Sequence, residues 1–175
     1  DPGRPPLNKY IPSSEAEERN EKLSDFPLQL LSPHSRYPFH VMGDDEDAAI
    51  RDIREHRILV DGHYYLTARI NRKDAEQRGI KDDDLIRLWN NRGSVVCAAQ
   101  VTDRLRPGVI SASTASVEYR PAGEPGRSTD LGGCVNLLTP QKGTPDHTHS
   151  ITPNSTLIQV EKWTGVDTWQ PAEAV

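Results

Sequence analysis

The chain has 175 residues, 34% of them hydrophobic, and a formal net charge of −5. This length suits one domain with a sizeable core, while 14 prolines exclude a long all-helical fold. The negative charge argues against a nucleic-acid-binding protein, which needs a basic face, and no apolar run approaches the ~20 residues of a membrane span.

The first 25 residues begin with Asp rather than Met and are rich in Pro, Glu, Asn and Ser. This composition is typical of an extended arm, so we expect residues 1–25 to link the chain to a preceding domain. Residues 26–165 are then the folded domain and residues 166–175 a tail. Two cysteines and the lack of a signal-peptide pattern predict a reduced, cytoplasmic protein. The first residue, Asp, and the arm-like composition of residues 1–25 suggest that the chain is a piece of something longer.

A dense set of polar side chains follows the first apolar run. Residues 26–31 predict a buried strand, and the loop after it carries Ser32, Pro33, His34, Ser35, Arg36, Phe39 and His40. Because Pro33 and Pro38 exclude regular hydrogen bonding, we expect a rigid loop. Its amides and cationic side chains suit a polyanion, most simply a phosphate or pyrophosphate. The alternative is a capped turn whose polar groups satisfy one another.

Four acidic residues lie near the start of the next segment, residues 43–56, which ends in Arg and His. This order matches a helix macrodipole and predicts a short surface helix, in which residues 44–47 cap the helix rather than hold a cation. Further on, we predict a tight turn at Asp61-Gly62, a half-buried strand at 64–70, and a short helix at 72–78 closed by Gly79.

Short β-branched strands separated by turns make up most of the remaining pattern. Strands are predicted at residues 85–89, 94–101, 109–113 and 156–161, with a hairpin turn at 90–93. They indicate a mainly β fold built on a small barrel. Residues 116–154 predict a long functional loop. Within it, Asn136 is either a turn amide bonded to its own backbone or an amide that offers a paired donor and acceptor to a heterocycle.

Three motifs, in this order, resemble one family. They are Ser-Pro-His-Ser-Arg followed by Pro-Phe-His at 32–40, Ile-Asn-x-x-Asp-Ala-x-x-Arg-Gly-Ile-x-x-x-Asp-Leu-Ile at 70–86, and Gly-Cys-Val-Asn-Leu-Leu-Thr-Pro at 133–140. Together they resemble the C-terminal molybdopterin-dinucleotide-binding domain of the dimethyl-sulfoxide-reductase superfamily, from about Pro27 to Trp163. The phrases Leu-Ser-Pro-His, Met-Gly-Asp, Arg-Gly-Ser-Val and Val-Glu-Lys-Trp resemble in particular the large subunits of the pyrogallol–phloroglucinol transhydroxylases. Asp83 stands where relatives commonly carry Gly, and Asp tolerates a left-handed backbone.

The resemblance implies a double-psi, aspartate-decarboxylase-like β-barrel with short helices and long irregular loops. It implies a bis(molybdopterin guanine dinucleotide) molybdenum cofactor, with residues 32–40 along the pterin and pyrophosphate and with Asn136, Thr139 and Asn154 at the pterin. By resemblance, the full enzyme transfers a hydroxyl group between phenolic rings. Its partners would be the other domains of the same subunit and an iron–sulfur small subunit, without a membrane. Since this family carries its metal ligand and acid/base groups in earlier domains, no catalytic residue is expected here.

Two other classes remain open. Gly93-Ser94 is the dipeptide at which aspartate-decarboxylase-like barrels cleave themselves, although a hairpin turn needs this glycine for backbone reasons anyway. A non-catalytic partner-binding barrel would use the acidic helix as its interaction face. Cys97 and Cys134 are expected to pack rather than to bind a metal. Residues 146–149 have His-x-His spacing without further ligands, so no metal site is expected there.

Overall fold

A computed structural model describes Glu15 and residues 20–38, 48–114, 118–140 and 153–165. Its elements, in chain order, are η1 (Glu21–Leu23), β1 (Leu28–Leu31), α1 (Ala48–Arg51), β2 (Arg57–Val60), β3 (His63–Asn71), α2 (Arg72–Gln77), β4 (Leu85–Trp89), β5 (Ser94–Thr102), β6 (Val109–Ala112), β7 (Pro121–Ala122), β8 (Thr129–Asp130), η2 (Val135–Leu138), η3 (Pro153–Ser155) and β9 (Thr156–Lys162), where η denotes a 3₁₀ turn. None of the described helices has the length and apolar character needed to cross a membrane.

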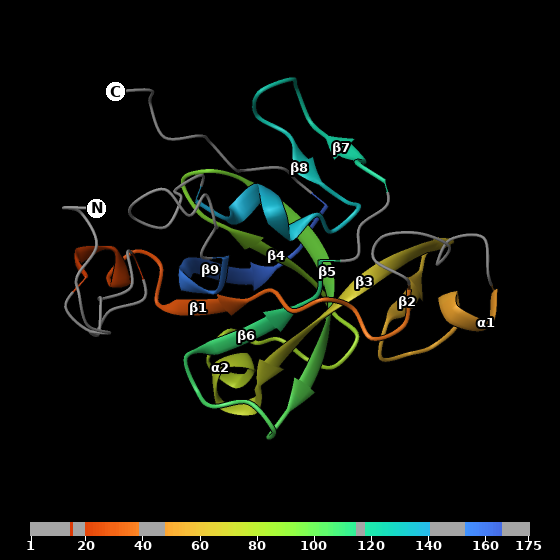
Figure 1. Cartoon of the computed structure of the whole chain (residues 1–175), viewed down its shortest axis with the longest axis horizontal. Helices are drawn as coiled ribbons and strands as arrows, with labels where there is room; N and C mark the ends of the chain where they lie inside the picture. The colour runs from red at the N-terminus through yellow and green to blue at the C-terminus, as the bar shows by residue number, and fades with distance from the viewer. Residues whose placement is uncertain (1–14, 16–19, 39–47, 115–117, 141–152, 166–175) are drawn as a thin grey trace, which may run out of the picture.

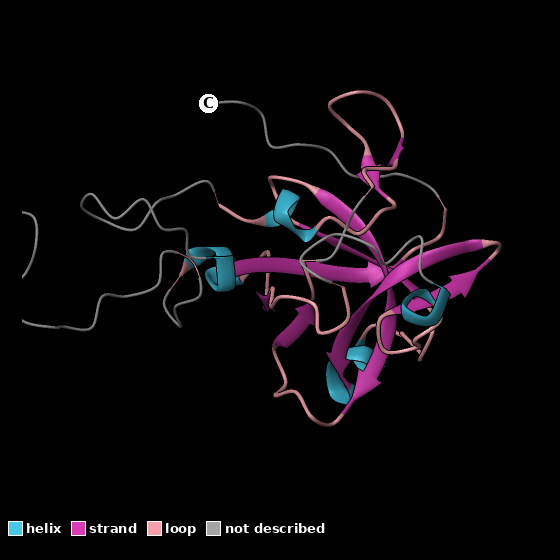
Figure 2. Ribbon diagram, turned by 45° about the vertical axis from the view of Figure 1, so that its right-hand side comes forward, coloured by secondary structure: helices cyan, strands magenta, loops and turns pink. Residues whose placement is uncertain are grey.

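Six strands close into a barrel in the order β1, β9, β4, β5, β3 and β6, so that β6 returns to β1 (Figure 1). The pairs β1–β6 and β3–β5 are parallel, and the other four pairs are antiparallel. This closed, mainly β arrangement is a double-psi β-barrel, which confirms the predicted fold class. The β2–β3 hairpin extends to one side of the barrel, and the β7–β8 hairpin projects at the top of both views (Figures 1 and 2).

Apolar side chains from all six barrel strands fill the interior. The buried cluster contains Leu28, Leu30, Ala68, Ile70, Ile86, Leu88, Val95, Cys97, Ala99, Ile110, Ala112, Ile158 and Val160, together with Ala75, Ile80, Val135 and Leu138 from the connections. Burial of this area from water is the main force that closes the barrel. Because Val135 and Leu138 belong to the cluster, the η2 turn is packed directly onto the core.

Strand β3 is buried on both faces over its middle, and the prediction of a half-buried strand is wrong there. Leu66, Ala68 and Ile70 alternate as predicted, but Tyr65 and Thr67 are also buried. Tyr65 packs outside the barrel with Ile58, Val96 and Ala98, a second cluster that Leu131 and Trp163 partly cover. Its cover includes β2, a strand that the sequence pattern did not reveal.

The local turn signals agree with the structure. Asp61 and Gly62 have φ of +49° and +81°, the left-handed pair that a tight β2–β3 hairpin turn requires. Asp83 has φ of +68°, as its place in a glycine position suggested. Helix α2 is capped by the side chain of Asn71, which accepts a hydrogen bond from Lys73 N, and Gly79 follows it with φ of +64°.

Gly93 is needed for a different reason from the predicted one. Its φ is not left-handed, but a Cβ at this position would lie 2.8 Å from the backbone oxygen of Leu137. The glycine therefore permits a close approach between the β4–β5 turn and η2. Of the predicted 43–56 helix, the described part contains only α1, after which the chain turns, and residues 44–47 lie outside the described residues.

Candidate functional site: a polar cavity and a clamped turn

The loop after β1 leaves the barrel without regular structure through residue 38, as the two prolines predict. Two bonds hold its start. Ser32 N donates to Asn154 Oδ1 at 2.9 Å, and Thr114 N donates to the carbonyl of Pro33 at 3.0 Å. Tyr37 packs on the buried ring of His56, with centroids 5.5 Å apart. The loop is thus fixed against β9, β6 and the segment before β2.

A cavity of about 720 Å³ lies beneath this loop. Its walls come from segments far apart in the sequence: Pro33, His34, Ser35, Arg36 and Tyr37 from the loop; Arg54, Glu55 and His56; Thr67 and Arg69 of β3; Asp82; Gln100, Val101, Thr102, Arg104 and Leu105 at the end of β5; and Ser111 and Ser113 around β6. Such a volume is in the range of pockets that hold small ligands and cofactors.

Strand register explains how the barrel contributes to this cavity. Arg69 pairs with Gln100 on one side and with Ser111 on the other. Residues directly opposite on neighbouring strands point to the same face. This row therefore lies on the outer face of β3, opposite the face that buries Ala68 and Ile70. It places a guanidinium, an amide and a hydroxyl side by side on the barrel wall.

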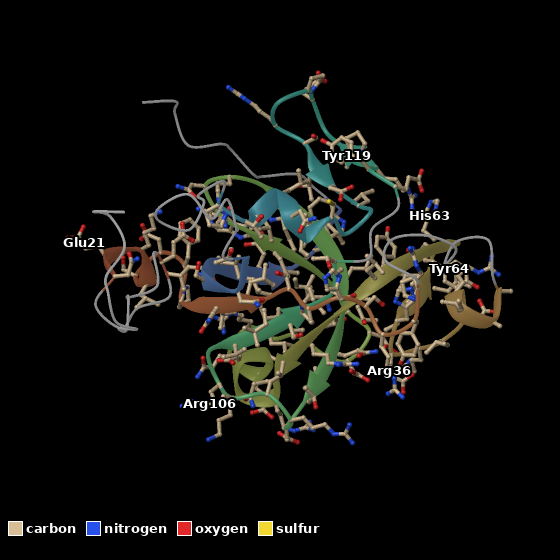
Figure 3. The ribbon with its side chains drawn as sticks, viewed as in Figure 1. Glu21, Arg36, His63, Tyr64, Arg106 and Tyr119 are labelled. Atoms are coloured by element: carbon tan, nitrogen blue, oxygen red, sulfur yellow. The ribbon has the colours of Figure 1, made fainter. Side chains whose placement is uncertain are left out.

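The arginines of the cavity differ in how they are paired. Arg54 contacts Asp82 at 3.0 Å and Asp83 at 2.8 Å. Arg69 has only a 3.4 Å bond from Nε to Gln100 Oε1. The side chains of Arg36 and Arg104 make no hydrogen bond or ion pair with a described residue, and Figure 3 shows Arg36 on the side of the molecule that carries α1 and β2. Three guanidinium groups are thus available to an anion.

The turn η2, which carries Asn136, is held at both ends. At its start, the fully buried carboxylate of Asp130 accepts hydrogen bonds from Arg120 N (2.8 Å), Gly132 N (2.9 Å) and Cys134 N (2.7 Å). At its end, the carbonyl of Leu138 accepts from Asn90 Nδ2 at 2.9 Å and from Arg92 Nε at 2.8 Å. Such a network fixes the backbone of the turn.

Arg92 also links Glu15 to this network, which we call the η2 clamp. Its guanidinium forms a bidentate pair with Glu15, at 2.6 and 2.9 Å, and Glu15 accepts from Leu157 N at 3.3 Å. Glu15 is 5% exposed. Burial opposes its ionisation, but the bonds and charges of Arg92, Leu157 N and Lys22 outweigh burial and lower the pKa of the carboxyl below its ordinary value.

The predicted contact residues fall into two groups. Ser32 Oγ is buried and has no hydrogen-bond partner, and the exposed amide of Asn136 makes no bond to a described residue. The alternative of an Asn136 amide bonded to its own backbone is therefore not what the structure shows. By contrast, Ser35 Oγ accepts from Tyr37 N at 3.3 Å and Thr139 Oγ1 donates to Asn136 O at 2.9 Å, as in capped turns.

The structure brings some of these residues together and not others. Ser32 and Asn154 are in contact, and residues 33–36 share the cavity. Asn136, Thr139 and Asn154 do not line the cavity, whose wall opposite the loop is formed by the barrel. Phe39 and His40 lie outside the described residues.

Cys97 packs in the barrel core, as predicted, whereas Cys134 is only partly buried. Burial, with a contribution from Asp130, raises the pKa of the Cys97 thiol to about 12, and burial also raises the pKa of Cys134. Within the ranges that the structure describes, no group of three or more His, Cys, Asp or Glu residues could hold a metal ion, and residues 146–149 lie outside those ranges.

Comparison with known proteins names the family. The family model described as "Molydopterin dinucleotide binding domain" matches residues 28–156, which include most of the barrel, the cavity and η2. The chain belongs to this molybdopterin-dinucleotide-binding family. The family predicted from the three motifs is confirmed.

Named relatives of this molybdopterin-dinucleotide-binding domain are all much longer than it. It is 42% identical to the pyrogallol hydroxytransferase large subunit of Pelobacter acidigallici, over 94% of this chain and 19% of that protein. It is 32% identical to the dimethyl sulfoxide reductase DmsA of Escherichia coli, over 90% of this chain and 17% of that protein. In structure it resembles acetylene hydratase from Pelobacter acetylenicus, with a TM-score of 0.62 and 14% identity, over 90% of this chain and 21% of that one, which supports the fold.

Proposed function

We propose that this chain is the cofactor-binding domain of a molybdenum enzyme that transfers hydroxyl groups on polyhydroxylated aromatic rings. The observation that carries the proposal is the 42% identity to a pyrogallol hydroxytransferase large subunit over 94% of the chain. The chain spans only 19% of that relative, so the activity of the whole enzyme is part of the proposal. The ligand is then a bis(molybdopterin guanine dinucleotide) cofactor.

The donor set suits such a ligand. A pterin edge needs paired donors and acceptors, and a pyrophosphate needs Arg, hydroxyl and amide donors. Ser32 is 7% exposed, and its buried Oγ has no hydrogen-bond partner among the described residues, which is costly unless a ligand supplies one. The exposed amide of Asn136 offers both a donor and an acceptor. These unsatisfied groups support a bound heterocycle.

In this proposal the chain binds and orients, and the reaction takes place at a metal that other domains help to hold. When bound, the cofactor supplies the molybdenum at which oxygen is transferred. Asn154 fixes the Ser32 backbone through its 2.9 Å bond, and the clamp around η2 presents the amide of Asn136 in one position. We assign contacts with the pterin and the pyrophosphate to the loop Ser32 to His40, which includes Pro33, His34, Arg36, Phe39 and His40. Further pterin contacts are assigned to Asn136 and Thr139.

The proposal extends to the parent protein. Residues 1–25 are the link from preceding domains, residues 26–165 the binding barrel and residues 166–175 a tail. The parent subunit works in the cytoplasm with an iron–sulfur small subunit. The 1–175 chain alone has no turnover in this proposal, because the metal ligand and the acid/base groups belong to other domains.

Cofactor content tests the site. We expect Ser32→Ala and Asn136→Ala to lower the amounts of molybdenum and guanine nucleotide bound per protein at least about tenfold. Both substitutions are made in the full-length protein that carries this chain. The reason is that each removes a polar contact with the cofactor. Asn91→Ala is the matched control, because Asn91 is likewise an exposed turn amide, on the β4–β5 turn. Full cofactor content in the Arg36→Ala/Asn136→Ala double variant would instead support a partner-binding barrel without cofactor.

Activity tests the reaction. The full-length protein should transfer a hydroxyl group from or to pyrogallol, while the purified 1–175 chain should not. Reduction of dimethyl sulfoxide or trimethylamine N-oxide without hydroxyl transfer would instead place the enzyme with the reductases, two of which are 31% and 32% identical to this chain. Intact mass should show no break before Ser94, whose buried hydroxyl accepts a 2.9 Å bond from Thr129 Oγ1.

A further inference from the structure

The barrel wall adds the guanidinium groups of Arg69 and Arg104 to the cavity, beside that of Arg36 from the loop after β1. We propose that Arg69 and Arg104, with Arg36, form the binding site for the diphosphate of the dinucleotide. This inference rests on the proposed function and names the part of the ligand that the cavity holds. It assigns a role to β3 and to the end of β5, outside the motifs that carry the family resemblance.

The charge of the cavity is opposite to that of the chain. The chain has a formal net charge of −5, but the described residues that line the cavity include four arginines and two carboxylates, Glu55 and Asp82. Asp82 is already engaged, since it contacts Arg54 at 3.0 Å and accepts a 2.8 Å bond from Val101 N. A local excess of positive charge in an acidic protein attracts an anion to this place and not to the rest of the surface.

The three arginines are available, in contrast to several elsewhere on the barrel. Arg72 has a bidentate contact with Asp103, and Arg92 has one with Glu15. Arg69 has only its long bond to Gln100, and Arg36 and Arg104 have no side-chain partner among the described residues. Guanidinium groups without a carboxylate bind phosphate oxygens in a bidentate fashion, with strong directional preference.

Hydroxyl groups complete the donor set. Thr102 Oγ1 accepts a 3.2 Å bond from Arg104 N, and Ser35 Oγ accepts one from Tyr37 N. Because each oxygen is used as an acceptor, its hydroxyl proton remains free to donate to a ligand. Both residues line the cavity. The donors come from three separate elements around one space of about 720 Å³, which suits a ligand with many acceptor oxygens better than a single carboxylate.

Titration with phosphate-bearing probes tests this site directly. We expect the 175-residue chain to bind inorganic pyrophosphate and guanosine diphosphate more tightly than guanosine, with affinity that falls as salt rises. The Arg69→Ala/Arg104→Ala double variant should bind pyrophosphate at least about tenfold more weakly, since two charge-assisted contacts are lost. Arg104→Ala alone, in an exposed connection, guards against misfolding and should give a smaller loss.

Arg106→Ala is the matched control. Arg106 is exposed, lies two residues beyond Arg104, does not line the cavity and is well separated from Arg36 (Figure 3). Its variant should bind pyrophosphate as the unchanged chain does. Equal pyrophosphate affinity in the double variant and the unchanged chain would overturn the inference, and so would guanosine binding as tightly as guanosine diphosphate.

Cofactor content separates this inference from the proposed function. In the full-length protein, Arg69→Ala/Arg104→Ala should lose guanine nucleotide together with molybdenum. If Ser32→Ala and Asn136→Ala lose the cofactor but the arginine double variant keeps it, the proposed function stands and the diphosphate site is elsewhere. If none of these variants loses cofactor, the proposed function itself fails.

Discussion

The loop after β1 and the turn η2 each offer polar groups, but the chain uses its hydrogen bonds differently in the two regions. In the loop, Ser32 Oγ and the Arg36 guanidinium have no partner among the described residues. At η2, the groups that flank Asn136 are saturated by Asp130, Asn90 and Arg92. The loop therefore offers several polar groups without partners among the described residues, whereas η2 offers one such group, Asn136, on a backbone whose position is set by the barrel.

This difference separates binding from stability. A substitution in the clamp of η2 leaves buried backbone donors or acceptors unsatisfied, so it should cost folding free energy first and binding as a consequence. Replacing Ser32 or Arg36 by Ala removes a side-chain polar group that has no partner among the described residues, so it should affect binding alone. The variants below, from the largest expected effect on stability to the smallest, test that separation.

Asp130→Ala should be the most destabilising change. It removes the acceptor of three short hydrogen bonds from backbone N–H groups, and each buried unsatisfied donor costs on the order of 1–3 kcal/mol. We expect a loss of about 4 kcal/mol in urea unfolding, and roughly half of that for Asp130→Asn, which keeps one acceptor oxygen. Asp103→Ala is the control, because Asp103 is an exposed partner of Arg72. Equal stability of the Asp130 and Asp103 variants would refute the clamp.

Gly132→Ala tests the same clamp by steric means. A Cβ at Gly132 would lie 1.9 Å from the backbone oxygen of Glu118 and 3.1 Å from Asp130 Oδ1, so the backbone at Glu118 or Gly132 would have to shift beside the Asp130 network. We expect a loss of roughly 3 kcal/mol, as for overpacking in a core. Gly126→Ala, where φ is +79° but nothing lies within 4 Å, should cost about 1 kcal/mol from backbone strain alone. Urea midpoints of the two variants should differ accordingly.

Glu15→Gln probes the far end of the clamp. The pair with Arg92 lies near the buried end of η2, and hydrogen bonds to charged groups are worth about 2 kcal/mol. Because the folded state lowers the pKa of Glu15 from its ordinary 4.5, this stability is fully present above that value and is lost as the pH falls through the lower folded pKa.

The pH dependence gives the measurement. The gap in urea midpoint between the unchanged chain and Glu15→Gln should be largest at neutral pH and should close below pH 4.5. Glu21→Gln is the control, since Glu21 is exposed (Figure 3). A gap that stays constant from neutral to acidic pH would show that the Glu15 charge does not stabilise the fold.

Sequence patterns were sufficient wherever the cause was local. The Asp61-Gly62 turn and the end of α2 at Gly79 each depend on the conformational preferences of one or two residues, so both could be predicted from the chain. The loop after β1 was predicted to bind an anion because its donors are consecutive in the sequence. The structure agrees that this loop follows a barrel strand.

The remaining site residues depend on barrel closure, which no local pattern contains. Alternation along β3 puts Arg69 on the face opposite Ala68 and Ile70, but only the register with β5 and β6 places it beside Gln100 and Ser111. Asp130 is likewise ordinary in sequence, and its function comes from three amides that the fold gathers around it. The need for glycine at position 93 was wrongly attributed to the hairpin turn. Its actual cause is the close approach of Leu137, which is distant in the sequence and becomes a neighbour only in the folded chain.

Arg36→Ala should have the smallest effect on stability and one of the clearest effects on binding. The side chain is exposed and has no partner among the described residues, so its removal takes no interaction from the folded chain. We expect an unchanged urea midpoint together with a several-fold weaker affinity for pyrophosphate. A fall in stability like that of the Glu15 variant would mean that the loop is held by its own cation, as a capped turn would be. Unchanged stability with weakened binding would show that the loop contributes to ligand binding, whereas the network around η2 contributes to folding stability. The physical reason is that a polar group without a partner in the folded chain remains able to bond to a ligand.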